Sequence, residues 1–314
     1  KRDSAEQIDA IVAEDIGKFP DQNLAESLQR VPGVSIDRDA GEGRSITVRG
    51  LGPDFTRVRL NGMEALSTTG GTDSSGGANR GRGFDFNVFA SELFNNLTVR
   101  KTQSAEVDEG SLGATVDLRT GRPFDYRKFT ATVSGQMSYN DLSGSWDPRF
   151  AGLISNTWAD GRAGAALSVA HSERSTLEEG FSAVRWEPTS ASGGFCSPVG
   201  VTPASSAPGS SAANCATGIP RPANTASNVS AYTTATAPGV FAPRLPRYGR
   251  LTHEQERTGI TGTFQFRIND DTTVAVDALY SKLQATRQED FLETISFSRT
   301  AAQGGKPQTE VVAA

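Results

Sequence analysis

Only two imidazole side chains are available for acid–base chemistry, and neither stands in a catalytic or metal-binding pattern. His171 continues one face of an alternating segment, and His253 lies in the polar run LTHEQE. Metal and nucleophile motifs need further His, Cys or carboxylate groups at defined spacings, which are missing around both residues. We therefore expect both histidines to be surface residues and the chain to have no enzymatic activity, no metal and no cofactor.

A glycine-rich stretch, residues 64–83, raises the question of phosphate binding because it contains Arg80 and Arg82 in the sequence EALSTTGGTDSSGGANRGRG. It lacks the G-x-x-x-x-G-K-[ST] pattern of a phosphate loop. The segment 41–43, GEG, lacks the third glycine of the dinucleotide pattern, because position 46 is Ile. Residues 64–83 have almost no apolar side chain, so we expect an exposed loop. The net charge of -5 gives no electrostatic reason to expect nucleic acid.

The two cysteines, Cys196 and Cys215, lie in one stretch rich in Gly, Pro and Ser. A local disulfide between them would indicate an oxidising compartment and would stabilise the loop by about 3 kcal/mol. The alternative is a free pair of thiols in a cytosolic loop.

The segment 129–140, FTATVSGQMSYN, alternates without interruption between two kinds of side chain. The odd positions are apolar or glycine: Phe129, Ala131, Val133, Gly135, Met137 and Tyr139. The even positions are small or polar: Thr130, Thr132, Ser134, Gln136, Ser138 and Asn140. About 9–11 tilted strand residues cross a bilayer core, so this pattern predicts a strand between hydrocarbon and a wet interior. The alternative is a strand of a soluble sandwich with one face in water.

Alternation returns in later segments, which predicts four more strands, at 149–158, 163–172, 256–268 and 272–287. Tight turns at 160–162 and 269–271 alternate with a long connection, 173–255, and outer-membrane barrels show this parity of short and long loops. Tyr139 and Trp158 near strand ends would serve as interfacial anchors. Hydrophobic residues make up 36% of the chain, and no run approaches the ~18–20 apolar residues of a membrane helix. Five strands cannot close a barrel around a domain, so we expect this chain to be a fragment.

The N-terminal part predicts a compact mixed α/β domain. Asp21 can cap a helix over residues 22–30 that Pro32-Gly33 ends, and four apolar residues allow one helical face in residues 8–16. Short strands are expected at 34–37, 45–49, 57–60, 97–100 and 114–118, with a turn at Asn61-Gly62 and a short packed helix within 84–96. We expect this domain to span residues 1–122. A linker is expected at 123–128, and the strands and loops of the second part at 129–314.

Three motifs resemble the N-terminal part of TonB-dependent outer-membrane receptors: LAESLQRVPGVSIDRD (24–39), ITVRGLGPDFTRVRLNGM (46–63) and FNNLTVRKTQSAEVDEGSLGATVDLRTGRP (94–123). Two phrases, IVAEDIGKFPDQN (11–23) and FDFNVFASELFNNLTVRK (84–101), are similar to a branch abundant in Xanthomonas and Caulobacter, several of whose members import carbohydrates. The resemblance implies an antiparallel membrane β-barrel of 22 strands in the bacterial outer membrane, with an α/β plug domain inside. It also implies import energised through the TonB–ExbB–ExbD complex. The TonB box and signal peptide should precede Lys1, and about 17 strands should follow the five seen here.

The resemblance also suggests where a ligand and the barrel wall would contact the plug. The loop 64–85 should rise toward the outer opening, where candidate ligand-binding side chains are Thr69, Asp73, Asn79, Arg80, Arg82 and Asp85, with Phe84 or Trp186 stacking on a sugar ring. Candidate plug–wall contacts are Arg49, Arg57, Arg59, Arg100, Glu106, Asp108 and Glu109 on the plug, and Gln265 and Arg267 on the wall. The alternative is that the loop residues are solvated and that the plug charges stay within the plug.

The function expected on these grounds is that of an active transport receptor for a scarce extracellular solute, with carbohydrate favoured over a ferric siderophore by the branch resemblance. A passive porin or an adhesive barrel would not need the N-terminal domain. The rival from another class is a soluble or surface β-rich binding or adhesion protein.

Overall fold

The computed structural model describes residues 7–12, 23–65, 67, 81–102, 104–105, 107–183, 186–189, 195, 197–202, 221–243 and 246–293. The chain forms two compact units. The first comprises Lys1–Leu177 with Thr252–Arg287, and the second Glu178–Leu251 with Gln288–Ala314. No helix among the described residues is long and apolar enough to cross a membrane.

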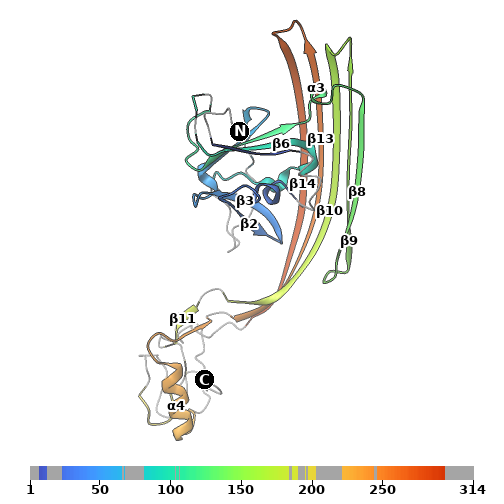
Figure 1. The fold of residues 1–314 in the computed structure, drawn as a ribbon. Coiled ribbons are helices and arrows are strands. Elements are labelled where there is room, and N and C mark those ends of the chain that lie inside the picture. The colour runs from blue at the N-terminus through green and yellow to red at the C-terminus, as the bar shows by residue number, and fades with distance from the viewer. Residues whose placement is uncertain are drawn as a thin grey trace. The chain divides into compact units, whose positions relative to one another are not determined.

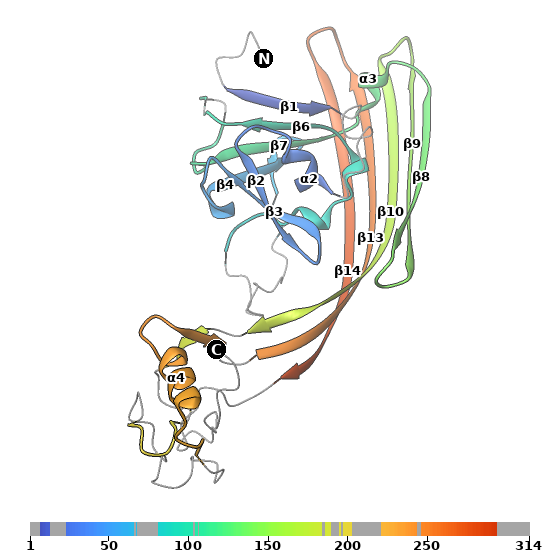
Figure 2. The same cartoon turned by 60° about the horizontal axis from the view of Figure 1, so that its bottom comes forward.

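The N-terminal domain of the first unit is built on a mixed five-stranded sheet. Its strands are β1 (Ile8–Val12), β4 (Thr56–Leu60), β5 (Met63–Glu64), β6 (Phe94–Arg100) and β7 (Ala114–Thr120), in the order β1-β6-β7-β4-β5. Strands β4 and β7 are parallel, and the other pairs are antiparallel. A hairpin of β2 (Val34–Asp39) and β3 (Glu42–Val48) and the helix α2 (Leu24–Leu28) complete the domain (Figure 2). Every strand expected from the motifs of this part is confirmed.

The core of the N-terminal domain is apolar and includes Leu24, Leu28, Ile46, Phe86, Leu93, Leu97, Val99, Val116 and Leu118, all at most 2% exposed. Burial of each such large side chain contributes roughly 1.5–3 kcal/mol. Two single-turn 3-10 helices, η2 (Phe86–Val88) and η3 (Ser91–Leu93), carry part of this core. They stand where one short helix was predicted, and another 3-10 turn, η1 (Pro53–Phe55), precedes β4.

Two local predictions are wrong in this domain. Residues 8–12 form a strand instead of a helical face. They pair with β6 from Ile8↔Arg100 to Val12↔Asn96 and so become the edge strand of the sheet. Helix α2 is capped by Asn23, not Asp21: the Asn23 Oδ1 accepts a hydrogen bond of 3.1 Å from the Glu26 amide. The turn at Asn61-Gly62 is confirmed, with φ of 49° and 92° at its two residues.

The second sheet, here called the wall sheet, has five strands in the order β14-β13-β10-β9-β8 (Figure 1). They are β8 (Thr130–Asn140), β9 (Ser145–Trp158), β10 (Ala163–Ala183), β13 (Pro246–Arg267) and β14 (Thr273–Glu293), and the short helix α3 (Pro123–Tyr126) leads into β8. The pairs β8/β9 and β9/β10 are antiparallel. All five predicted strands are therefore present.

Several wall strands are longer than their alternating patterns. β10 continues to Ala183 and β13 begins at Pro246, so the long connection is 184–245 instead of 173–255. β9 begins at Ser145, which leaves 141–144 as the first connection. The added part of β10 carries Leu177 and Phe181, but Glu173 and Glu179 interrupt the same face, so the hydrophobic period is lost there.

The wall sheet has two chemically different faces. Register places Val133 opposite Gly152, Ala131 opposite Ile154 and Ile154 opposite Leu167, which gathers apolar side chains on one face. Exposed members of this face include Val133, Met137, Tyr139, Trp146, Phe150, Ile154, Trp158, Leu167, Val169, Ile260, Phe264 and Phe266. Val133 is 88% exposed. The opposite face carries Ser155, Ser168, Thr261, Thr263 and Gln265, all buried.

The described part of the second unit contains β11 (Trp186–Pro188), β12 (Phe241–Pro243) and the helix α4 (Ala226–Ala235), together with the far ends of β10, β13 and β14. Its loop is organised around Arg221, which donates to the carbonyls of Ser197 at 2.9 Å and Pro198 at 2.7 Å. The predicted disulfide partners, Cys196 and Cys215, lie outside the described residues.

Candidate functional site

A buried carboxylate, Glu42, joins the N-terminal domain to the wall sheet. It follows the tight turn between β2 and β3, and it is 1% exposed. Its Oε1 lies 2.9 Å from the Arg257 Nη2, and its Oε2 accepts a hydrogen bond of 3.0 Å from Gln255. Arg174 Nη1 stands 3.9 Å from the same Oε2, and Arg257 also donates to the carbonyl of Asn87 at 2.5 Å. The charge of the Glu42 carboxylate is therefore compensated by two wall arginines and by a hydrogen bond from one amide.

Further polar contacts seat the same domain on the wall. Arg149 pairs with Glu92 and donates to the Ser91 hydroxyl at 2.7 Å. The remaining contacts join Ser281 to the carbonyl of Val88, Arg287 to Asp39 at 3.4 Å, and Arg122 to Asp277 at 2.6 Å. These hydrogen bonds and ion pairs stand beside apolar contact, since Ala170 of β10 belongs to the same buried cluster as the core of the domain.

A glycine of the wall permits close packing at this contact. A Cβ added to Gly259 of β13 would clash with the Cδ1 of Leu93, which is itself 2% exposed. Gly262 of the same strand would meet nothing within 4 Å. Only a residue without a side chain fits at position 259 while Leu93 holds its place.

Four of the predicted plug contacts form inside the N-terminal domain instead, as the alternative had it. Arg59 and Arg100 both donate to Asp117, at 2.6 and 2.7 Å. Burial by itself raises the pKa of the Asp117 carboxyl, but the hydrogen bonds from the two arginines outweigh it and leave that pKa lowered. Arg49 donates to the carbonyls of Gly113 and Lys101.

Arg57 is the fourth of these residues. It forms an ion pair with Glu64 at 2.5 Å and also donates a hydrogen bond to the Glu109 carbonyl. Their mutual hydrogen bond raises the pKa of Arg57 and lowers that of Glu64. Asp108 adds to the field at Arg57, and Glu106 lies outside the described residues. The sequence thus identified charged residues of the domain but not the ones that contact the wall.

The two predicted wall residues contact the linker. Gln265 accepts a hydrogen bond of 3.0 Å from the Phe124 amide, and the Arg267 guanidinium lies 5.4 Å from the centre of the Phe124 ring. Phe124 belongs to α3, so this pair of wall residues fixes the segment that enters the first wall strand.

The structure removes two of the predicted ligand-binding residues from that role. Phe84 is buried and stacks on Phe89 with ring centres 5.8 Å apart, so its ring is not available to a sugar. Asp85 is buried and accepts a hydrogen bond of 2.7 Å from Arg44. Both residues are buried at the point where the chain re-enters the core of the domain after the glycine-rich stretch.

Of the other ligand candidates, the structure describes Arg82 and Trp186. Arg82 donates from its amide to Asp54 at 2.7 Å and from its guanidinium to the Gly110 carbonyl at 3.0 Å. Trp186 is 59% exposed in the second unit. Thr69, Asp73, Asn79 and Arg80 lie outside the described residues.

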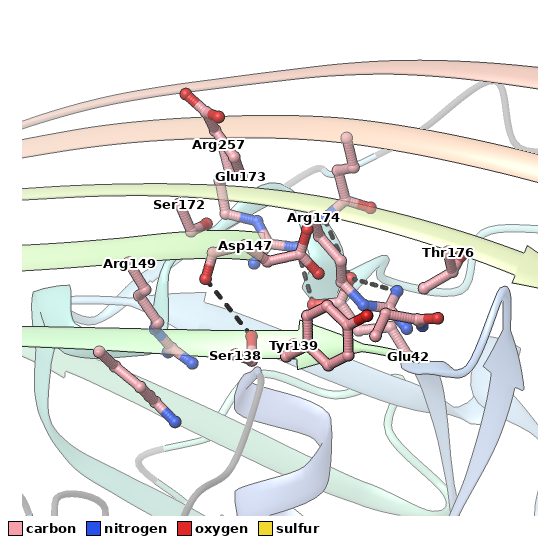
Figure 3. Close-up of a pocket in the computed structure, with 13 residues that line it drawn as sticks. Glu42, Ser138, Tyr139, Asp147, Arg149, Ser172, Glu173, Arg174, Thr176 and Arg257 are labelled. Atoms are coloured by element: carbon pink, nitrogen blue, oxygen red, sulfur yellow. Dashed lines mark hydrogen bonds and ion pairs between the residues drawn. The ribbon is translucent and has the colours of Figure 1, made fainter. Parts of the chain in front are cut away.

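A polar cavity of about 420 Å³ opens beside Glu42 (Figure 3). Four wall strands line it, through residues such as Gln136 of β8, Asp147 of β9, Arg174 of β10 and Arg257 of β13. One pattern in the sequence points to this site. Extending the alternation of β13 toward its start puts the odd-numbered Gln255 and Arg257 on the same face as Thr261 and Gln265.

Comparisons with known proteins agree with the fold of the N-terminal domain. Residues 1–115 match the family model described as TonB-dependent Receptor Plug Domain. The chain is 30% identical over 132 residues to the ferric enterobactin receptor PirA of Pseudomonas aeruginosa, a match that covers 40% of this chain and 18% of that protein.

Solved structures with a similar chain trace include the siderophore receptor PirA of Acinetobacter baumannii, at 13% identity and a TM-score of 0.44, covering 93% of this chain and 49% of that one. The alcaligin outer-membrane receptor FauA of Bordetella pertussis aligns at 14% identity and a TM-score of 0.42, covering 92% and 40%. The chain therefore spans less than half the length of these proteins.

Proposed function

Because this chain belongs to the TonB-dependent outer-membrane receptors, as a plug domain followed by part of the barrel, we propose that the receptor imports a scarce extracellular solute into the periplasm. Energy would reach it through the TonB–ExbB–ExbD complex. The solute that we propose first is a carbohydrate.

The observation that carries the transport proposal is the polar contact between the N-terminal domain and the wall sheet. A wide barrel without a plug would leak, so a folded domain must fill it. Here the buried Glu42 and its partners Arg257 and Gln255 hold that domain by a few directional contacts. Polar contacts of this kind can be exchanged for contacts with water when the domain shifts.

Support for a carbohydrate comes from the phrases at 11–23 and 84–101, which resemble a branch with carbohydrate importers. A ferric siderophore is the second candidate, because the relative that shares 30% identity over 132 residues is named for ferric enterobactin. Neither candidate requires catalytic residues.

Uptake measurements test the proposal. Deletion of the gene should abolish cellular accumulation of one labelled sugar or one labelled ferric siderophore, and inactivation of TonB should reproduce that loss in cells that keep the receptor. Accumulation of every tested solute at the parental rate in both strains would contradict active transport by this receptor.

A further inference from the structure

We propose that the edge of β10 over residues 178–183 is a docking strand for an extended segment of a protein outside the cell, a segment that carries apolar and basic side chains on one face. The inference goes beyond the proposed transport and does not depend on which solute is imported. It uses only the side of the membrane on which this edge lies. Long connections of outer-membrane barrels are extracellular, and β10 leads into the connection 184–245.

One edge of β10 loses its partner strand before β10 itself ends. The pairing of β10 with β9 reaches Ser172↔Arg149, and β9 begins at Ser145, whereas β10 continues to Ala183. The order of the wall sheet is β14-β13-β10-β9-β8, so among the described strands none other lies on this side of β10. The end of β10 therefore has β13 on one side and an open edge on the other.

The backbone of Ser175 shows which groups of β10 point to this edge. Its amide donates to the Asp147 Oδ1 at 2.9 Å, and its carbonyl accepts a hydrogen bond of 3.1 Å from the Ser145 hydroxyl. Both partners belong to β9, so these two groups of Ser175 point away from β13. Every second residue of a strand directs its backbone groups to the same side, so Glu179 and Phe181 direct theirs to the open edge. An extended peptide can pair with such groups by adding a strand to the sheet.

Exposed apolar side chains form a row beside the open edge. The row, here called the rim triad, consists of Phe181 of β10, Tyr248 of β13 and Leu292 of β14, which are 56%, 68% and 81% exposed. On the reverse face of these strands, Arg247 donates to the Ser182 hydroxyl at 3.0 Å and lies 4.6 Å from the centre of the Phe291 ring. Neighbouring residues of a strand face opposite ways, so these contacts put the rim triad together on the other face. Clustered apolar side chains of this kind mark protein interaction sites.

The rim triad is separate from the lipid-facing surface. On the same face of β10, the apolar residues Leu167 and Val169 are followed by His171 and Glu173, and Phe181 follows Val169 by 12 residues. That stretch corresponds to about 40 Å of strand, longer than the ~30 Å thickness of the hydrocarbon core. Acyl chains therefore do not explain the exposed rings, and a protein partner does.

The charges of the edge indicate the chemistry of that partner. Residues 176–183 include two exposed carboxylates, Glu178 and Glu179, and no basic residue. Arg250 lies 3.9 Å from Glu179, but both side chains are more than half exposed, so the pair contributes little. A second copy of β10 would bring further carboxylates to this edge, whereas a lysine or arginine on the incoming strand would compensate them. The segment that fits carries a basic side chain opposite Glu179 and an apolar one opposite Phe181.

The test uses a fluorescein-labelled peptide, STVTKTVTS, in which threonine alternates with valine and a central lysine. When the lysine lies opposite Glu179, a valine lies opposite Phe181 on the same face. Binding to the intact receptor in detergent micelles would be measured by fluorescence anisotropy, beside the peptide STVTETVTS. The parent receptor should bind the lysine peptide roughly 5-fold more tightly than the glutamate peptide, and high salt should reduce the difference.

Two receptor variants test the side chains of the edge, each with a matched control. Glu179→Lys should reverse the preference, so that the glutamate peptide binds more tightly. Glu254→Lys reverses an exposed carboxylate of β13 outside this edge and should keep the parental preference. Phe181→Ala should weaken the lysine peptide roughly 2- to 5-fold, the effect of one cross-strand pair. Phe150→Ala removes a ring that is similarly exposed, at 54%, and should leave binding unchanged.

N-methylation of the peptide distinguishes strand pairing from adhesion to the rim triad. In an antiparallel pair, the residue opposite Glu179 exchanges both backbone hydrogen bonds with it, so a methyl group on the lysine amide should abolish binding. A methyl group on the amide of the next threonine, which points away from the edge, should be tolerated.

Equal effects of the two methyl groups would overturn the inference, as would no binding of the lysine peptide or a preference that Glu179→Lys leaves unchanged. A receptor that dimerises through Phe181 and ignores the peptide would also overturn it, in favour of a second copy. None of these outcomes bears on the transport proposal, which fails separately if the deletion strain keeps parental uptake.

Discussion

At the scale of single residues, the ion pair of Glu42 and Arg257 is the most consequential contact between the plug domain and the wall, because both side chains are almost fully buried. A buried pair contributes little compared with an apolar replacement, yet removal of one partner leaves an uncompensated charge. The pair therefore favours the one position of the plug in which both charges are compensated.

Glu42→Gln should destabilise the seated plug by about 3–5 kcal/mol, since Arg257 would remain charged and buried beside a neutral amide. Amide hydrogen exchange of β3 in the intact receptor measures the effect as faster opening. Glu64→Gln, which breaks an exposed pair of the same domain, is the matched control and should change exchange little. Equal exchange in the two variants would show that Glu42 does not hold the plug.

Asp117 makes the stability of the plug depend on pH. Its folded-state pKa is lowered, so the stabilisation from Arg59 and Arg100 is fully present above the ordinary aspartate pKa of about 3.9 and is lost as the pH falls through the folded value. On acidification, the parent should lose stability more steeply than Asp117→Asn. Parallel pH profiles of urea unfolding for the two proteins would contradict this.

The residue contacts were the hardest part to infer from sequence. Glu42 and Arg257 are 215 positions apart, and only the folded chain brings them together. Alternation tells which side of a strand a residue faces, but it does not tell which plug residue meets it. The plug arginines are conspicuous by their charge, whereas nothing in the sequence marks Asp117 as the partner of Arg59 and Arg100.

At the scale of elements, the packing of η3 against β13 depends on the absence of a side chain at Gly259. Gly259→Ala should force Leu93 or the strand to move, at a cost of roughly 1–3 kcal/mol for overpacking. Gly262→Ala adds the same methyl group to the same strand where it meets nothing within 4 Å, so it is the control.

Hydrogen exchange of the amides in β6 would report the Gly259→Ala effect, because β6 follows η3 directly. We expect faster exchange in Gly259→Ala and parental exchange in Gly262→Ala. Faster exchange in both variants would mean that any change in β13 loosens the plug, and the specific role of this glycine would be lost.

The elements themselves were largely predictable. Period-two alternation located all five wall strands, because hydrocarbon on one face and polar contacts on the other require it. It could not locate the far ends of β10 and β13, because charged residues such as Glu173, Glu179 and Glu254 interrupt the apolar face there. The sequence of residues 8–12 does not reveal the strand, because a short apolar cluster fits a helix as well as an edge strand and only the pairing with β6 decides between them.

At the scale of the whole molecule, the account depends on the two faces of the wall sheet. One face presents exposed apolar side chains such as Val133, Leu167 and Phe264, and the other buries hydroxyls and amides near the plug. A contiguous exposed apolar surface of this size would be a liability in water and is expected against lipid. Both the barrel and the proposed transport require the apolar face to lie against lipid and the polar face to lie toward the plug.

The most direct measurement is the environment of spin labels on the intact receptor in lipid bilayers. Labels at Val133, Leu167 and Phe264 should collide more often with oxygen, which concentrates in lipid, than with a water-soluble nickel chelate. Labels at their neighbours Thr132, Ser168 and Thr263 should not show that preference. Preferential contact of the first three labels with the nickel chelate would contradict the account at its centre.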